Sequence, residues 1–370
     1  MSAPACAACL RHCVRLLLRL TPAVRSRENA LFASEAEYRA AIDQCAAEGI
    51  KLEMTHIQIP ESITLGLVDE RDADIEQICR CIEAAGRAGL RGLNYNFLVG
   101  AAYARTEEYE ESIGRGGSSY SQFDLDRYDN SPPELVDGVW SNGGAGVVSR
   151  EEVYERAKYF LEGVIPTAEK WNVQMACHLN DPPAPVLRGV EQWNYPVFEG
   201  IRRFSELVDS PMHGFNFCCG TAAEGLANPG VELYEIVEHF GKRQQLFNIH
   251  FRNVKGGLHD FQEVWPDEGD VNVSAASLLA SKKGGVLKQL LRVADQMFKL
   301  AQTLHRTGYP YMLMPDHAPG HPDHSVPDQP GKGVPFAFQF GYIIAVRAAC
   351  TTSLAGLRSH TNSAFRPSRR

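Results

Sequence analysis

Four short apolar runs decide how this chain folds, because each has the length of a strand and ends on a residue that can bind a metal. The four runs are QMACH (174–178), GFNFC (214–218), LFNIH (246–250) and YMLMPD (311–316). Their last residues are His178, Cys218, His250 and Asp316. Runs that are apolar without alternation and are separated by helical stretches indicate a parallel sheet covered by helices. In a β/α barrel the active site lies at the carboxyl ends of the strands, so these four side chains are predicted to meet there.

Two more strand-like runs, IKLEMTHI (50–57) and GLNYNF (92–97), precede these four. Helices are predicted between and after the strands, over residues 35–48, 72–88, 149–170, 190–208, 230–241, 274–306 and 336–351. The helix over 149–170 begins with a capping box formed by Ser149 and Glu152. We therefore predict an α/β fold, a (β/α)8 TIM barrel in which the first two strands are lacking or replaced. An open doubly wound sheet is the alternative, although no glycine-rich phosphate-binding motif follows any strand.

The ends of the chain differ in composition from the middle. Residues 1–34 form a basic segment, interpreted as a transit peptide, a disordered tail or the product of a misassigned start. Residues 35–352 are predicted to form the metal-dependent barrel. Residues 353–370 are rich in Ser and Arg and contain no acid, so we expect a disordered tail. Residues 100–149 are rich in Gly, Ser and Tyr, which predicts a long loop or an excursion from the fold, and loops of this length are often functional lids.

The overall composition argues against several classes of protein. A net charge of −8 and a pI near 5.9 argue against nucleic acid as a partner. No apolar run approaches the ~18 residues of a spanning helix, so no membrane partner is expected. The ten cysteines lack the spacing of a disulfide scaffold and are predicted to be free thiols in a reducing compartment. We expect a cytoplasmic protein, or an organellar one if residues 1–34 are a transit peptide. The sequence leaves a homo-oligomer open.

The four residues that end the strands have the chemistry of a metal site. Two imidazoles, one thiolate and one carboxylate can hold one divalent metal and leave room for water or substrate. These donors suit zinc, and they leave manganese and iron open. Each residue also has a simpler interpretation: a histidine can be a satisfied polar residue, Cys218 a small core residue, and Asp316 the cap of a turn. Four such residues at equivalent positions favour the metal site.

Residues that follow the strands are candidates for contact with a substrate. Asn180 and Asp181 lie beyond the first ligand, and Arg252 lies beyond the third. A guanidinium in that place would clamp a substrate carboxylate through two hydrogen bonds, although a surface salt bridge is the commoner role of a loop arginine. His317 follows Asp316 directly, and neighbours in an extended chain face opposite ways. It is therefore predicted to lie beside the metal without binding it, and its unperturbed pKa suits proton transfer.

Longer motifs carry a family resemblance. They are ACHLNDPP (176–183), GFNFCCGT (214–221), NIHFRNVKGG (248–257), DFQEVWPDEGDV (260–271), MLMPDHAPGH (312–321) and FAFQFGYI (336–343). Over residues 35–349 the chain resembles the mannonate dehydratase family. The resemblance implies a TIM barrel of the xylose-isomerase-like type and one divalent metal, Mn2+ or Fe2+. It implies a hydro-lyase that acts on a sugar acid and converts D-mannonate to 2-keto-3-deoxy-D-gluconate.

The same resemblance implies roles for individual residues. The metal ligands would be His178, Cys218, His250 and Asp316, with Cys218 rather than Cys219 matching the family's cysteine. His317 and Tyr342 would be the catalytic residues, one moving the proton α to the carboxylate and the other assisting the departing β-hydroxyl. Two alternatives stand beside this interpretation: a sugar isomerase or epimerase on the same barrel, and an inactive remnant of the family that has lost its first strands.

Overall fold

The computed structural model describes residues 33–100, 112–271, 297–309, 312–321 and 333–363. Its centre is a sheet of six parallel strands in the order β1-β2-β8-β11-β12-β15. These strands are β1 (Met54–His56), β2 (Gly92–Asn96), β8 (Gln174–His178), β11 (His213–Cys218), β12 (Leu246–His250) and β15 (Leu313–Met314). Each of them lies within or overlaps one of the six predicted runs, so the predicted strands are confirmed.

The sheet is an open arc of a β/α barrel in the part of the chain that the structure describes. Successive strands pair in parallel, with Met54 opposite Gly92 at one edge and His250 opposite Met314 at the other. No pairing of described residues joins β1 to β15. A closed eight-stranded barrel would need further strands between these two edges, and this agrees with the prediction that two strands are lacking or replaced.

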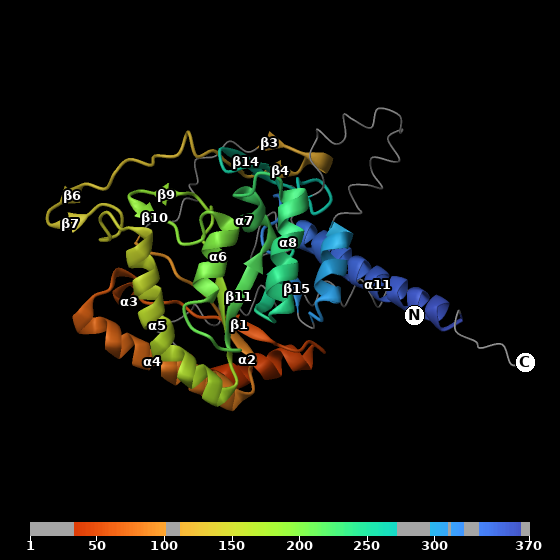
Figure 1. The fold of residues 1–370 in the computed structure, drawn as a ribbon, viewed down its shortest axis with the longest axis horizontal. Coiled ribbons are helices and arrows are strands. Elements are labelled where there is room, and N and C mark those ends of the chain that lie inside the picture. Colours follow the sequence, from red (N-terminus) through yellow and green to blue (C-terminus); the bar gives the residue numbers. More distant parts are fainter. Residues whose placement is uncertain (1–32, 101–111, 272–296, 310–311, 322–332, 364–370) are drawn as a thin grey trace, which may run out of the picture.

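Helices cover the outer side of the arc (Figure 1). They include α2 (Glu35–Ala47), α3 (Glu61–Leu65), α4 (Val68–Ala88), α5 (Arg150–Trp171) and α8 (Pro229–Lys242), whereas α7 (Cys219–Glu224) lies at the carboxyl end of β11. Helix α5 has the predicted capping box, in which the backbone N–H of Ser149 donates to the Glu152 carboxylate at 2.8 Å. The buried side chains of α4 and α5, such as Ile78 and Phe160, join those of the strands in one apolar core. None of the described helices is both long enough and apolar enough to cross a membrane.

One predicted helix is present but shorter than expected. Within residues 190–208 only α6 (Val197–Ser205) is helical, because the chain before it forms a hairpin of β9 (Val186–Leu187) and β10 (Val190–Glu191). The two turn residues, Arg188 and Gly189, both have a positive φ. A two-residue hairpin turn requires this conformation, and a right-handed helix excludes it.

The last helix is longer than predicted. Helix α11 (Gly333–Ser363) passes residue 351, so the segment predicted as a disordered tail begins as helix. Of the helix predicted over 274–306, residues 297–306 are described and helical. The basic segment of residues 1–32 and the end of the tail, residues 364–370, lie outside the described residues.

The long segment after β2 lies over the carboxyl ends of the strands (Figure 1). It contains β3 (Ser112–Ile113), η1 (Arg115–Gly117), β4 (Ser119–Tyr120), β5 (Gln122–Phe123), β6 (Leu135–Val136) and β7 (Val139–Trp140). Strand β5 joins β13 (Val254–Gly257) and β14 (Asp260–Glu263) in a small antiparallel sheet. The backbone of Ser119 also pairs with that of Gly320, just beyond Asp316. This location agrees with the predicted loop, of which residues 101–111 lie outside the described part.

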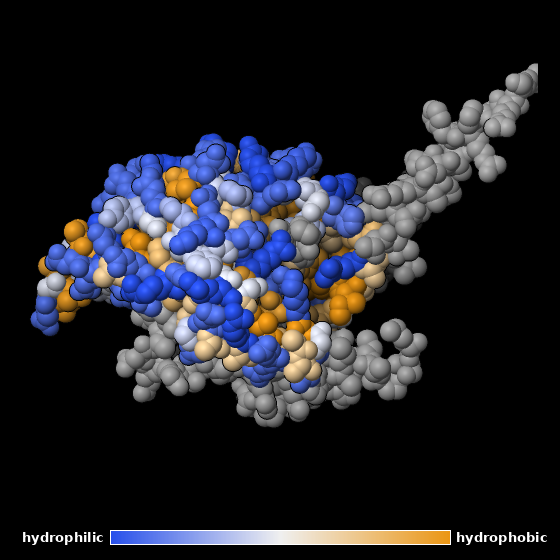
Figure 2. All heavy atoms as spheres, turned by 90° about the horizontal axis from the view of Figure 1, so that it is seen from below, coloured by the Kyte–Doolittle hydropathy of each residue, from blue (hydrophilic) through white to orange (hydrophobic). Residues whose placement is uncertain are grey.

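The amino ends of the strands lie at the end of the molecule opposite the predicted ligands. Figure 2 shows the molecule from below, where hydrophilic side chains cover most of the surface and apolar side chains gather in a patch near its middle. A hollow of about 1090 Å³ lies at the amino ends of the strands, where Arg91, Trp171 and Gln245 are among its lining residues. The predicted ligands lie at the carboxyl ends, so this hollow does not belong to the candidate site.

Candidate metal centre

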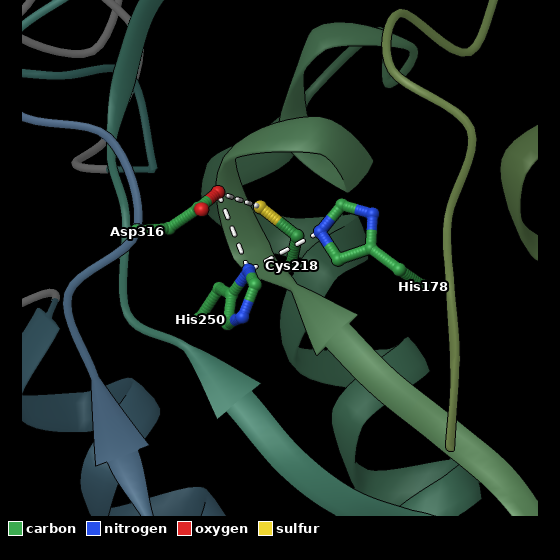
Figure 3. A group of neighbouring side chains, drawn as sticks. All are labelled: His178, Cys218, His250 and Asp316. Atoms are coloured by element: carbon green, nitrogen blue, oxygen red, sulfur yellow. Dashed lines mark hydrogen bonds and ion pairs between the residues drawn. The ribbon is translucent and has the colours of Figure 1, made fainter. Parts of the chain in front are cut away.

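The four predicted ligands converge at the carboxyl ends of the strands (Figure 3). His178, Cys218 and His250 end β8, β11 and β12, and Asp316 follows β15. Each side chain offers one ligand atom, and these atoms lie within 4.8 Å of one another. His178 Nε2 is 3.2 Å from His250 Nδ1, which is 3.3 Å from Asp316 Oδ2. Cys218 Sγ is 3.5 Å from the same Oδ2 atom. The predicted convergence is therefore confirmed.

The register of the parallel strands explains this convergence. Cys218 lies opposite His250, and His178 lies opposite the residue two positions before Cys218. Asp316 comes two positions after the residue that pairs with His250. Because side chains alternate across a strand, positions that are level or two apart on neighbouring strands face the same side. All four side chains therefore face the inside of the arc at one end.

Two further contacts orient the imidazoles. His178 Nδ1 lies 2.6 Å from the backbone carbonyl oxygen of Leu179, to which it donates, so Nε2 faces the group. His250 turns Nδ1 toward the group and Nε2 toward the side-chain amide of Asn216, 3.1 Å away. Asn216 in turn accepts a hydrogen bond from Asn248 at 3.0 Å. Outer partners fix ring orientation in metal sites, and the Leu179 carbonyl oxygen does so for His178 in a way that fits a metal-binding role.

The charges of the group favour a cation. Burial and the Asp316 carboxylate oppose ionisation of Cys218, but Arg252 and hydrogen bonds from both histidines outweigh them and lower the pKa of this thiol to about 5. Burial disfavours a charged His250, but Asp316 and Cys218 raise the pKa of this imidazole to about 10. Despite its burial, Asp316 has a pKa well below the ordinary value because His250 lies beside it. A thiolate and a carboxylate thus lie around the Nδ1 proton of His250, and a divalent ion in place of that proton would balance their charges.

This ionisation state can be tested in metal-free protein. We expect the ultraviolet absorbance of a thiolate at pH 7, and we expect it to disappear as the pH falls through about 5, because the folded-state pKa of Cys218 is depressed. Burial raises the pKa of Cys81 to about 11, and that of Cys219 well above its ordinary value, so these thiols stay neutral at pH 7. The Cys218→Ser variant supplies the baseline. A difference signal that titrates near the ordinary thiol pKa would contradict the assignment.

Arg252 lies behind the group and is almost wholly buried, with 1% of its surface exposed. Its five N–H donors all have acceptors within the protein. Nε donates to Glu263 at 2.8 Å, and one Nη2 hydrogen donates to the other oxygen of the same carboxylate. The second Nη2 hydrogen donates to Glu224 at 2.7 Å. Nη1 donates to Asp181 at 2.9 Å and to the Thr221 hydroxyl at 3.0 Å. We call these five residues the Arg252 cluster.

The Arg252 cluster changes the interpretation of this arginine. A substrate carboxylate could bind its guanidinium only by displacing a buried carboxylate of the protein, so the predicted clamp does not fit the surroundings of Arg252. Instead, Nη1 lies 3.6 Å from Cys218 Sγ, where its charge favours the thiolate. The close approach depends on Gly220, because a Cβ atom there would lie 2.7 Å from the Arg252 side-chain carbons. The glycine after the two cysteines in GFNFCCGT therefore leaves the space in which the Arg252 side chain packs.

Asn180 and Asp181, the other predicted substrate contacts, are also buried. Asn180 donates to the Gln192 side chain at 2.9 Å. Asp181 accepts from Arg252 and from the Thr221 hydroxyl, the latter at 3.1 Å. The two residues thus lie on the same side of the site as the Arg252 cluster, and their contact with a substrate stays a prediction.

The two predicted catalytic residues have different surroundings. His317 lies beside the four donors without being one of them: its Nε2 is 3.7 Å from Asp316 Oδ1, and its Nδ1 is 3.0 Å from Glu263 Oε1. Tyr342, on α11, has a buried hydroxyl without a hydrogen-bond partner among the described residues. Its ring stacks on Phe338, and burial, together with Asp267, raises its pKa to about 12. The structure thus places His317 at the group and records no contact of Tyr342 with it.

Sequence reasoning did not assign roles to Glu224, Glu263 and Thr221. Thr221 and Glu263 occur in the motifs quoted above, and Glu224 lies three residues after Thr221. A single acidic residue in such a stretch says little about its partners. A weak signal existed for Glu263, because alternation along DFQE puts it on the same face as Phe261, and both are buried. A buried carboxylate needs a cationic partner, which points toward an arginine such as Arg252.

The fold and the site together define a β/α-barrel protein with a candidate metal centre at the carboxyl ends of its strands. The chain belongs to the D-mannonate dehydratase (UxuA) family, whose model matches residues 34–284. That region includes three of the four donors and ends before Asp316. The mannonate dehydratase of Thermotoga maritima is 28% identical over 298 residues, which cover 73% of each chain. That of Enterococcus faecalis is 27% identical over 352 residues, which cover 89% of this chain and 86% of the relative.

A solved structure supports the same fold. The crystal structure of mannonate dehydratase from Streptococcus suis serotype 2 matches with a TM-score of 0.68 and 21% sequence identity. The match covers 87% of this chain and 84% of that chain. At this identity the likeness concerns the fold, which is the predicted α/β barrel.

Proposed function

We propose that this protein is a metal-dependent hydro-lyase that converts D-mannonate to 2-keto-3-deoxy-D-gluconate and water. The observation that carries the proposal is the group of His178, Cys218, His250 and Asp316 at the strand ends, in a chain that belongs to the D-mannonate dehydratase family. The donor set, the hydrogen bond of His178 to the Leu179 carbonyl oxygen and the depressed pKa of Cys218 fit a divalent ion. We propose Mn2+ or Fe2+ as that ion.

The reaction removes the proton α to the carboxylate and expels the hydroxyl group on the β carbon; the enol that results becomes the 2-keto group. A bound divalent ion supplies Lewis-acid stabilisation of negative charge at this site. The chain's own contribution to proton transfer centres on His317, whose imidazole lies against Asp316 on one side and Glu263 on the other. Tyr342 is the second proposed acid–base residue, and its contact with the reacting atoms would require closer approach to the site.

The Arg252 cluster supports the site without facing a substrate. Its charge lies next to Cys218, so it keeps the sulfur ionised and in place. Because its donors are all engaged, we expect another group to recognise the substrate carboxylate. The ion itself is suited to that contact, since carboxylate oxygens are common ligands of manganese and iron.

The function is tested by turnover of D-mannonate with defined metals. Metal-free protein is reloaded separately with Mn2+, Fe2+ and Zn2+ and supplied with D-mannonate, with its C2 epimer D-gluconate as the matched substrate and with neutral ketoses. We expect the 2-keto-3-deoxy product from D-mannonate in the presence of Mn2+ or Fe2+, and none without metal. Conversion of a ketose without dehydration would establish the isomerase or epimerase alternative. Absence of metal binding and of all turnover would support the alternative that the chain is an inactive remnant of the family.

A further inference from the structure

We propose that Glu263 is a positioning residue that fixes the tautomer of His317, so that its Nε2 atom is the one presented for proton transfer. The inference rests on the proposed function, which assigns the proton transfer to His317. Glu263 ends strand β14 and is buried, with 4% of its surface exposed. It lies between Arg252 and His317 and contacts both side chains.

The two carboxylate oxygens of Glu263 contact different atoms of Arg252 and His317. Oε2 accepts from Arg252 Nε at 2.8 Å, and Oε1 accepts from Arg252 Nη2 while it lies 3.0 Å from His317 Nδ1. A carboxylate held by a guanidinium through both oxygens stays ionised, and an ionised carboxylate only accepts hydrogen bonds. Nδ1 of His317 must therefore carry the proton and donate it to Glu263. In the neutral imidazole this leaves the lone pair on Nε2.

The position of His317 explains why it matters which ring nitrogen carries the proton. Nε2 is the ring nitrogen near Asp316, at 3.7 Å from Oδ1, so it is the atom that faces the candidate metal centre. The side chain keeps 26% of its surface exposed, and a substrate can therefore reach it. The backbone is held as well, because Gln339 on α11 donates to the His317 carbonyl oxygen at 2.9 Å. A ring fixed at Nδ1 and at its backbone presents Nε2 in one direction.

The segment over the strand ends helps to hold Glu263. The backbone N–H of Glu263 donates to the Ser121 carbonyl oxygen at 2.9 Å, and β14 pairs with β5 on that side. On the other side Glu263 pairs with Val254 of β13, two residues after Arg252. Glu263 and strand β5 thus belong to one small sheet, and Arg252 lies two residues before its third strand, β13. The long segment after β2 is therefore connected, through Glu263, to the proposed acid–base residue His317.

The Glu263→Gln variant tests the inference, with Glu224→Gln as its matched control. An amide can either donate or accept, so glutamine at 263 no longer dictates which nitrogen of His317 is protonated. Glu224 is a second buried carboxylate on the same guanidinium, so both variants lose one ion pair of Arg252. Any effect on His317 beyond that shared loss belongs to Glu263.

The first readout needs no turnover. Long-range proton–nitrogen correlation spectra of metal-free protein labelled with 15N-histidine report the tautomer, and the His317→Asn variant assigns the signals. At alkaline pH we expect the wild type and Glu224→Gln to show the Nδ1–H form of His317, and Glu263→Gln to show a mixture. An Nε2–H form in the wild type, or an unchanged spectrum in Glu263→Gln, would overturn the inference.

The second readout is kinetic. In Glu263→Gln we expect kcat to fall by about 10–100-fold, the usual cost of losing an outer partner, with KM and metal content close to those of the wild type. A kcat that falls equally in both variants would show a general effect of the Arg252 cluster and would overturn the specific role of Glu263. If the wild type does not dehydrate D-mannonate while the spectra behave as expected, the proposed function fails and the tautomer assignment stands.

Discussion

The His317→Asn variant is expected to keep its metal and to lose kcat by about 10²–10⁴-fold, the range that one general acid or base contributes. His317 lies beside the group of four donors without contributing a ligand atom to it. Asparagine retains polarity and approximate size but cannot take up a proton at neutral pH. Metal content per chain and steady-state turnover of D-mannonate, measured on one preparation, separate the two properties.

The His178→Ala variant is the matched control, because it removes a proposed ligand at the end of strand β8. We expect it to lose metal affinity by more than the roughly 10–100-fold that removal of an outer partner causes, and to lose turnover with the metal. If His317→Asn also releases the metal, His317 belongs among the ligands. Full metal content in His178→Ala would place the ion elsewhere in the chain.

Replacing Arg252 by leucine is expected to lower the free energy of unfolding by about 3–5 kcal/mol, the usual cost of removing one partner from a buried ion pair. The change leaves the carboxylates of Asp181, Glu224 and Glu263 buried without their guanidinium. Charged groups in that environment must take up protons or draw in water. The loss should therefore be smaller at acidic pH, where protonated carboxyl groups no longer repel one another. Denaturant titration at neutral and acidic pH measures both effects.

Two further variants test whether the loss of stability is specific to the buried guanidinium of Arg252. Arg252→Lys keeps a charge but not the planar fork of donors, so an intermediate loss of stability is expected. Arg202 pairs with Glu206 on the surface of α6, and Arg202→Leu is expected to cost about 1 kcal/mol or less. If Arg252→Leu unfolds at the same denaturant concentration as Arg202→Leu, the Arg252 cluster does not stabilise the fold.

The strands and the ligand positions could be predicted because their signals are local. A run such as QMACH or LFNIH is too short and too apolar for a surface helix, and its last residue marks the carboxyl end. Parallel pairing then places such ends at one edge of the sheet, so His178, Cys218 and His250 meet without further information. The same local reasoning located the capping box at Ser149.

Other features depended on contacts that no local pattern reveals. The helix predicted over 190–208 begins only at Val197, because a positive φ at Arg188 and Gly189 turns the chain before it into a hairpin. The clamp assigned to Arg252 does not fit because its donors are taken by carboxylates from three separate segments. Tyr342 was chosen from its motif, and its buried hydroxyl makes no hydrogen bond among the described residues.

The sequence by itself determined the class of this protein: six apolar strands between helices, four residues of metal-ligand type at or near the strand ends, and a neighbouring histidine suited to proton transfer. These properties follow from residue type, spacing and chain direction, all of which can be read from the sequence. Only the tertiary structure decided how the ligands are charged and which residues hold them. Whether Cys218 is a thiolate, where Arg252 donates and which nitrogen of His317 carries a proton depend on charges brought together from distant segments. Electrostatic interactions follow distance in space, and a linear sequence does not contain that distance.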